Sequence, residues 1–432
     1  MRGRPIRRCE PETMRGGRVR PGARGALAAA AAHGGAHRLA APESLPPLPD
    51  RPGLLRDGAS GAAGCAVLLS RFDGGEWDRA AHRCLTLAVR ELEHADVRRP
   101  GMFDGLTGSA FGALLLSRDG TRYQRLLAEL DRGIVRDATS RAAVLAHARH
   151  GLPFESFDLV SGVTGTGAYL LRRNAYPAAL RAALTGLVAV CRWETDLPNW
   201  HTPAWSMAPR TPMAESFPGG VLNCGLAHGV PGPLALLSLA ELSGVSVAGQ
   251  REAIAVVGHW LAAHRADDAH GPNWPTGIPL PGTTAVGTRP RNAWCYGGPG
   301  VARALWLAGN AIDDGELRSL AVETMVAASS RFAATAETDP ALGLCHGVAG
   351  LLQITLRFAH DTGDSRFARA AVELTDRLLA GYDPAHRFGF RCARELPADR
   401  PGLLDGAAGI ALALLAASTG EAPDWDRMLL LA

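Results

Sequence analysis

The chain has 432 residues, 47% of them hydrophobic and 20% charged, so it is long enough for one large core or several average domains. All 45 basic residues are arginine, which excludes chemistry that needs a lysine amine, such as Schiff-base formation or P-loop phosphate binding. Residues 1–25 hold eight arginines against two glutamates, so the remaining chain is weakly acidic and lacks the basic surface that nucleic-acid binding requires.

The first 45 residues are rich in Arg, Ala and Gly, and no apolar run comparable to a signal-peptide core occurs before Gly25. This composition predicts a disordered extension over 1–45, with Met14 as an alternative start and a basic peptide-binding arm as the functional alternative. Residues 46–432 are predicted to form one domain. No stretch approaches the roughly 18 consecutive apolar residues of a membrane span, so we expect no integral membrane segment.

Cysteines are scattered through the chain without the tight spacing of a disulfide framework. We therefore expect them to be reduced and, for the most part, buried as small apolar side chains. They are Cys9, Cys65, Cys84, Cys191, Cys224, Cys295, Cys345 and Cys392.

A GxxG unit followed by an apolar run recurs seven times along the chain, at intervals of 47 to 68 residues. Each interval can hold two helices and their loops. The apolar runs predict helices buried on most sides, and amphipathic stretches between them, such as 76–94, predict helices that face water. The first glycines of the units are Gly58, Gly105, Gly162, Gly229, Gly297, Gly347 and Gly406.

Seven buried helices alternating with seven amphipathic ones predict an all-α fold, a closed α/α toroid with an inner and an outer ring. The glycine pairs would let the starts of the inner helices crowd together at one end of the ring. Their free N–H groups would then face a central mouth, where we expect the chemistry to lie.

The residue before each first glycine divides the repeats into two groups. In four repeats it is a favoured helix N-cap, and capping is the simplest interpretation of Asp57, Asp104, Ser161 and Asp405. In the three consecutive repeats between Ser161 and Asp405 it is a poor cap, namely His228, Tyr296 or His346. Cysteine precedes two of these residues, as Cys295 and Cys345. The preference for a helix N-cap residue has therefore been given up in three consecutive repeats, which lie along one arc of the ring.

Because the repeat register brings these loops together, we predict that Cys295, Cys345 and His346 bind one metal ion. Two thiolates and one imidazole favour zinc, with a fourth position open as in catalytic sites. Cys224, four residues before His228, would lie near this site. We assign it to packing, because a fourth protein thiolate would close the open position.

Four segments resemble the lanthionine synthetase C-like family, the lantibiotic cyclases, and the likeness extends from about residue 50 to the C-terminus. They are FPGGVLNCGLAHGVPGPL at 217–234, GPNWP at 271–275, RNAWCYGGPG at 291–300 and GLCHGVAG at 343–350. The resemblance implies an α/α toroid with zinc held by Cys295, Cys345 and His346. It also implies a lanthionine synthetase, which adds a cysteine thiol of a leader-bearing precursor peptide to dehydroalanine or dehydrobutyrine and so closes a thioether ring.

The same resemblance assigns catalytic roles to three further residues. His228 matches the candidate acid or base, Asp158 the aspartate that would orient it or take the thiol proton, and Arg291 the arginine that could hold the enolate oxygen. Without the resemblance, His228 would be a buried histidine bonded to a carbonyl, Asp158 a helix cap, and Arg291 half of a surface ion pair. Asn292 stands where related sequences often carry an acidic residue.

The predicted partners are a dehydrated precursor peptide, a separate dehydratase and an exporter, because no kinase or dehydratase region precedes the predicted toroid. We expect a cytoplasmic protein, with peripheral membrane association through a biosynthetic complex as an alternative. Two rival functions use the same zinc site: addition of glutathione or another small thiol to dehydroamino acids, and a non-catalytic peptide-binding scaffold. A sugar-processing α/α barrel would need a carboxylate pair at the mouth, which Asp57, Asp104 and Asp405 could supply only if they are not caps.

Overall fold

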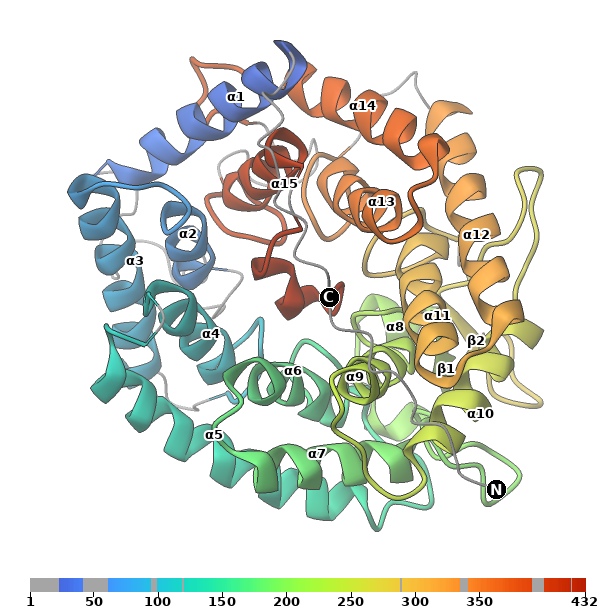
Figure 1. The fold of residues 1–432 in the computed structure, drawn as a ribbon. Coiled ribbons are helices and arrows are strands. Elements are labelled where there is room, and N and C mark those ends of the chain that lie inside the picture. The colour runs from blue at the N-terminus through green and yellow to red at the C-terminus, as the bar shows by residue number, and fades with distance from the viewer. Residues whose placement is uncertain are drawn as a thin grey trace, which may run out of the picture.

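The structure is a computed structural model that describes residues 23–41, 61–94, 99–118, 120–287, 290–334, 341–390, 400–420 and 422–432. Figure 1 shows two concentric rings of helices with the C-terminal segment at the centre. The predicted α/α toroid is therefore confirmed. Met14, Asp57, Gly58, Cys9 and Cys392 lie outside the described residues, as do 1–22 and 42–60.

The inner ring consists of helices that follow the GxxG glycines and are buried along most of their length. All eight residues of the first of them are buried, because small side chains let neighbouring helices approach closely. These helices are α2 (Ala62–Leu69), α4 (Leu106–Leu116), α6 (Val163–Arg173), α9 (Pro231–Leu242), α11 (Gly298–Ile312), α13 (Val348–Thr362) and α15 (Ala407–Thr419).

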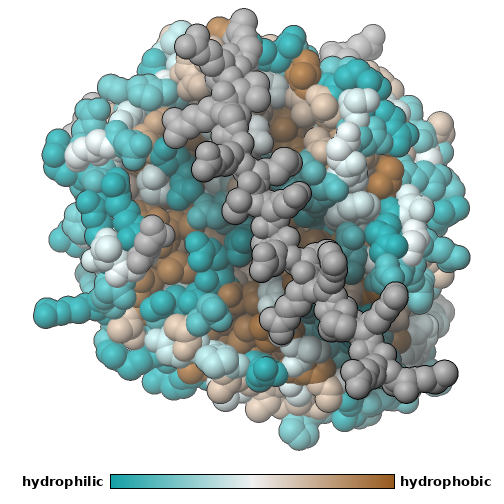
Figure 2. Space-filling model, viewed as in Figure 1, coloured by the Kyte–Doolittle hydropathy of each residue, from teal (hydrophilic) through white to brown (hydrophobic). Residues whose placement is uncertain are grey.

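The outer ring packs against the inner one and presents its charged residues to water. Figure 2 shows that hydrophilic residues predominate around the edge of the viewed face, while hydrophobic ones gather nearer the middle. The outer helices are α1 (Ala23–Ala40), α3 (Gly75–His94), α5 (Gln124–Leu145), α7 (Pro177–Val190), α10 (Gln250–Ala263), α12 (Gly315–Ala334) and α14 (Ser365–Ala380).

Helix α1 corrects the prediction of a disordered extension over 1–45, since residues 23–40 are helical and belong to the outer ring. It packs against α15 and α14, so the first helix of the described chain closes the ring beside the last (Figure 1). Ala28, Ala32, Ala36 and Leu39 lie on its buried face. The high alanine content gives this segment a strong helix propensity, and the small alanine side chains allow close packing.

The segments that link α7 to α9 and α10 to α11 form a small lobe. It contains the short helix α8 (Pro212–Ser216) and two antiparallel strands, β1 (Val221–Asn223) and β2 (Gly277–Pro279), in which Leu222 pairs with Ile278. The short 3-10 helices are η3 (Phe154–Ser156), η4 (Ala204–Ser206) and η5 (Trp425–Leu429).

The C-terminal segment fills the middle of the toroid (Figure 1). Asp426, which is fully buried, accepts hydrogen bonds from Gln353 Nε2 and Arg357 Nε, each at 2.7 Å. Arg303 Nε donates to the Leu431 carbonyl at 2.9 Å. These bonds satisfy charges that burial would otherwise penalise. No helix in the described ranges is long and apolar enough to cross a bilayer.

Candidate functional site

Backbone hydrogen bonds join the loops that precede successive inner helices. Cys345 N–H donates to the Leu404 carbonyl at 2.8 Å, and Cys295 N–H donates to the Cys345 carbonyl at 3.3 Å. In the next repeat toward the N-terminus, Ala227 N–H donates to the Cys295 carbonyl at 3.4 Å. This ladder, rather than any proximity in sequence, brings the candidate ligands together at the mouth.

Cys295, Cys345 and His346 each place one ligand atom at this point, and the three atoms lie within 4.8 Å of one another. Cys345 Sγ is 3.9 Å from His346 Nε2. Both thiols are buried, whereas the imidazole is exposed on its outer edge. The set therefore has an inner wall of sulfur and an open side. Two sulfurs and one nitrogen with an open side fit zinc.

The charges of the site favour a thiolate. Hydrogen bonding from the Cys345 thiol, aided by His346 and opposed by burial, holds the pKa of Cys295 well below its usual value. The pKa of Cys345 is raised by its hydrogen bond to Cys295 and by burial. Hydrogen bonds to Asp405 and Cys295 raise the pKa of His346 to about 10. These shifts favour negative charge on Cys295 and positive charge on His346.

Asp405 is a residue of this site that the capping interpretation missed. Its Oδ1 lies 3.3 Å from His346 Nδ1, whereas α15 has Gly406 as N-cap and no side-chain cap. A carboxylate on Nδ1 leaves Nε2 free to face the thiols and fixes the orientation of the ring. The repeat register was the signal that could have found it, because Asp405 precedes the glycine of the next repeat.

His228 and Asp158 form a short hydrogen-bonded pair in the loops that follow Cys295 along the same ladder. His228 Nδ1 is 2.6 Å from Asp158 Oδ2, and Asp158 is fully buried. The other oxygen, Oδ1, accepts from the N–H groups of Ser161 and Gly162, both at 2.8 Å. Asp158 therefore holds the turn before α6 and orients His228, whereas α6 has Gly162 as its N-cap and no side-chain cap, so the predicted capping role is wrong.

The surroundings of His228 set its proton affinity. Burial lowers its pKa, but the hydrogen bond and the negative charge of Asp158 outweigh this, and the net pKa is raised. The rings of Phe154 and Tyr296 lie 5.4 and 6.4 Å from the imidazole, centroid to centroid. Asn223 Nδ2 donates to the Tyr296 hydroxyl at 3.3 Å. The imidazole is thus held between two aromatic rings and remains partly exposed.

Arg291 is exposed, and within the described residues its guanidinium forms neither a hydrogen bond nor an ion pair. It lines a cavity of about 360 Å³ together with His346 and Phe332. Its backbone packs against Gly297, whose φ of +93° is in the region that favours glycine. Asn292 donates through Nδ2 to the Ala328 carbonyl at 2.9 Å, which ties this loop to α12.

Cys224 does not join the candidate ligands in the described structure. It is fully buried, its Sγ lies 3.6 Å from the Leu222 carbonyl, and burial raises its pKa to about 12. Trp294 and Trp274 lie in the core rather than lining an open cavity. Their indole N–H groups donate to the carbonyls of Leu429 and Leu261 at 3.1 and 2.8 Å.

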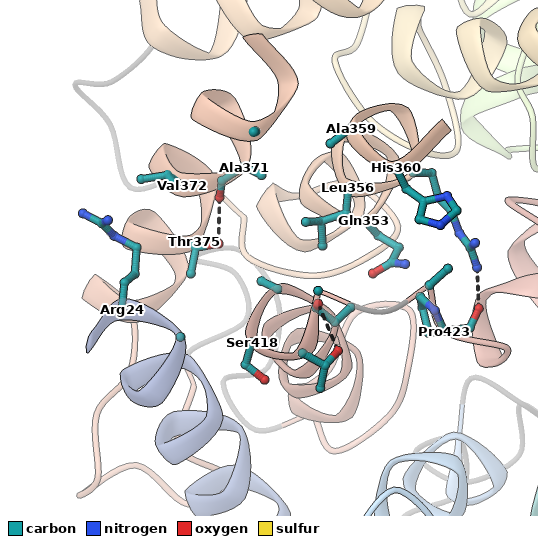
Figure 3. Close-up of a pocket in the computed structure, with 18 residues that line it drawn as sticks. Arg24, Gln353, Leu356, Ala359, His360, Ala371, Val372, Thr375, Ser418 and Pro423 are labelled. Carbon is teal, nitrogen blue, oxygen red and sulfur yellow. Dashed lines mark hydrogen bonds between the residues drawn. The ribbon is translucent and has the colours of Figure 1, made fainter. Parts of the chain in front are cut away.

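A second cavity, of about 550 Å³, lies at the opposite end of the inner helices (Figure 3). Its lining comes mainly from α1, α13, α14 and α15 and combines apolar side chains with polar and charged ones, among them Arg24, Gln353 and Arg357. The only described cluster of metal-ligating side chains lies at the other ends of these inner helices. The reactive groups therefore place the candidate site at the mouth and not in this cavity.

These features define an α/α toroid with a two-thiol, one-imidazole centre at its mouth. The family described as lanthionine synthetase C-like protein matches residues 50–430, and the chain belongs to this family.

Two relatives extend the comparison. The chain is 23% identical to the nisin biosynthesis protein NisC of Lactococcus lactis subsp. lactis over 312 residues, which are 70% of this chain and 73% of that protein. The solved structure of the nisin cyclase matches with a TM-score of 0.74 at 20% identity, over 88% of this chain and 93% of that one. This structural likeness shows that the two chains share a fold.

Proposed function

We propose that this protein is a zinc-dependent lanthipeptide cyclase. It would add a cysteine thiol of a dehydrated precursor peptide to a dehydroalanine or dehydrobutyrine of the same peptide and so form a lanthionine or methyllanthionine. The observation that carries the proposal is the convergence of Cys295, Cys345 and His346 at the mouth, in loops next to the one that carries His228 and its partner Asp158.

Cys295, Cys345 and His346 would hold the zinc ion, with Asp405 orienting His346. Bound there, zinc would lower the pKa of an incoming peptide thiol so that it reacts as a thiolate at neutral pH. The buried sulfurs would leave the open side of the centre to the peptide.

The chain's own residues account for the proton that the addition requires. The peptide sulfur bonds to the β-carbon, the electrons of the double bond move toward the carbonyl, and a proton must reach the α-carbon. The thiol gives up one proton and the product gains one C–H bond, so the reaction has no leaving group. His228 would deliver the proton from Nε2, because Asp158 holds Nδ1. Arg291, whose donors face no described partner, would stabilise the enolate oxygen.

The proposal also implies its partners and location. A separate dehydratase would supply the dehydro residues, an exporter would remove the product, and the substrate would be a leader-bearing peptide. We assign the reaction to the cytoplasm, where ligand cysteines stay reduced. The six described cysteines are all free, in keeping with this assignment.

The deciding experiment incubates the protein with a dehydrated leader peptide that contains one cysteine, with and without glutathione. Cyclisation leaves the mass unchanged and protects the cysteine from alkylation. Addition of glutathione instead raises the mass by one glutathione and leaves the peptide cysteine alkylatable. Recovery of linear peptide under both conditions, in the presence of zinc, would favour a non-catalytic scaffold and contradict the proposal.

A further inference from the structure

Ser161, at the turn before α6, has a partner for each of its polar groups. Its N–H donates to Asp158 Oδ1 at 2.8 Å, and its carbonyl accepts from Arg141 Nη1 at 2.8 Å. Its hydroxyl donates to Asp104 Oδ2 at 2.9 Å. Ser161 therefore joins the rim of the preceding repeat to the carboxylate that holds His228.

The surroundings of Asp104 do not fit the cap that its sequence position predicts. Helix α4 has Gly105 as its N-cap and no side-chain cap. The Asp104 side chain is 17% exposed, and its Oδ1 is buried without a hydrogen-bond partner among the described residues. Its ion-pair partner Arg99 is 3.7 Å away and itself 68% exposed, so this contact is weak.

The backbone joins the two turns without help from Asp104, because Phe103 N–H donates to the Val160 carbonyl at 3.1 Å. The carboxyl group is therefore not needed to connect the repeats. What it adds is a fixed position for the Ser161 hydroxyl. Burial also raises the pKa of Asp104, as expected for a carboxyl group with so few polar partners.

We propose that Asp104 is a positioning residue for His228 and acts through Ser161 and Asp158. Asp104 holds the Ser161 side chain, which aligns the Ser161 N–H with Asp158 Oδ1. That bond, with the one from Gly162, turns Oδ2 toward His228 Nδ1 and leaves Nε2 for proton transfer. The inference deepens the proposed cyclase function and rests on it for the identity of the reaction.

The first test is a double-mutant cycle of thioether formation with Asp104→Ala, Ser161→Ala and the double variant. We expect each single change to lower kcat about tenfold, as other orienting partners do, with KM and zinc content unchanged. Since both residues act in one chain of contacts, the double variant should be no slower than either single variant. Asp104→Asn, which keeps an oxygen acceptor for Ser161, should restore most of the rate.

Ser238→Ala is the matched control, because it also removes a buried serine hydroxyl, one that donates only to the Leu234 carbonyl inside α9. It should leave kcat unchanged. Losses that multiply in the double variant, or a wild-type rate for Ser161→Ala, would overturn the inference. If Asp104→Ala fails to fold, Ser161→Ala and Asp104→Asn still decide between these outcomes.

The second test does not depend on turnover. The 2.6 Å bond from His228 Nδ1 to Asp158 should give a downfield proton NMR signal, assigned by its loss in His228→Asn. We expect Asp104→Ala and Ser161→Ala to shift or broaden this signal, and Ser238→Ala to leave it in place. An unchanged signal in both rim variants would refute the inference. Absence of thioether formation by the wild type would refute only the proposed function.

Discussion

The mouth of the toroid has two arcs built on the same backbone. One arc, from Asp104 to His228, consists of carboxylates and a hydroxyl that hold an imidazole by hydrogen bonds. The other, from Cys295 to Asp405, gathers two thiols and a second imidazole. In both arcs the loops are joined by the same backbone ladder.

The GxxG repeat fixes the position of the side chain before its first glycine, but it does not fix the chemical type of that side chain. The residue before the first glycine is Asp104, Ser161 or His228 in the first arc and Tyr296, His346 or Asp405 in the second. Each contacts the neighbouring repeat rather than capping its own helix. We call the arc from Cys295 to Asp405 the metal arc and the arc from Asp104 to His228 the proton arc. The predictions below test whether the two arcs act separately.

Removal of a thiol should have the largest effect. We expect Cys345→Ala to lose zinc, because it lacks one ligand. The activation free energy of ring closure should rise by about 4 kcal/mol, which lowers the rate about a thousandfold, because the metal stabilises the reacting thiolate. The fold should survive, since alanine keeps the backbone hydrogen bonds of Cys345 with Leu404 and Cys295. Elemental analysis, circular dichroism and the cyclisation assay together check this. Unfolding on loss of zinc would instead indicate a structural metal site.

Replacement of the His228 imidazole should impair the proton arc and leave the metal arc intact. We expect His228→Asn to lower kcat about 100-fold or more, the usual contribution of a positioned acid or base. Zinc content should stay at the wild-type level, because His228 is outside the set of candidate ligands. Simultaneous loss of zinc would show that the two arcs are not separable.

Asp405→Ala should weaken the metal arc without removing a ligand. The His346 ring loses the partner of its Nδ1, so zinc affinity should fall about 10- to 100-fold. Competition with a chelator measures this, and added zinc should recover the rate. An unchanged affinity would mean that Asp405 does not orient His346.

The proton arc should also impose a pH dependence of defined sign. The pKa of His228 is raised above the ordinary value of 6.5, so His228 keeps its proton to a higher pH than a free histidine and loses it as pH rises through the raised value. With His228 as proton donor, kcat should fall on the alkaline side, by up to about tenfold per pH unit. Asp158→Asn should move this fall to lower pH. A rate that rises over the same range would assign His228 as a base.

The smallest effect is expected for Cys224→Ala, the control for the thiol variants. Its thiol is buried and apart from the candidate ligands, so zinc content and kcat should be unchanged. Loss of packing should lower the free energy of unfolding by about 1 kcal/mol. Loss of zinc would instead place Cys224 in the metal centre.

The repeat register in the sequence was enough to predict the toroid and the meeting of Cys295 with Cys345 and His346. It failed where side-chain direction decides the outcome. Asp104 and Asp405 occupy cap positions in the sequence, but the rim loops turn them sideways toward Ser161 and His346. Helix α1 was missed because an alanine-rich segment shows no amphipathic pattern until its packing partner is known.

The pairing of α1 with α15 has a consequence for synthesis. The ring cannot close until α15 has left the ribosome, more than 360 residues after α1. Until then, the buried alanines of α1 and the apolar face of α15 lack each other as partners. We therefore expect the nascent chain to be most prone to aggregation and to chaperone capture just before α15 is released.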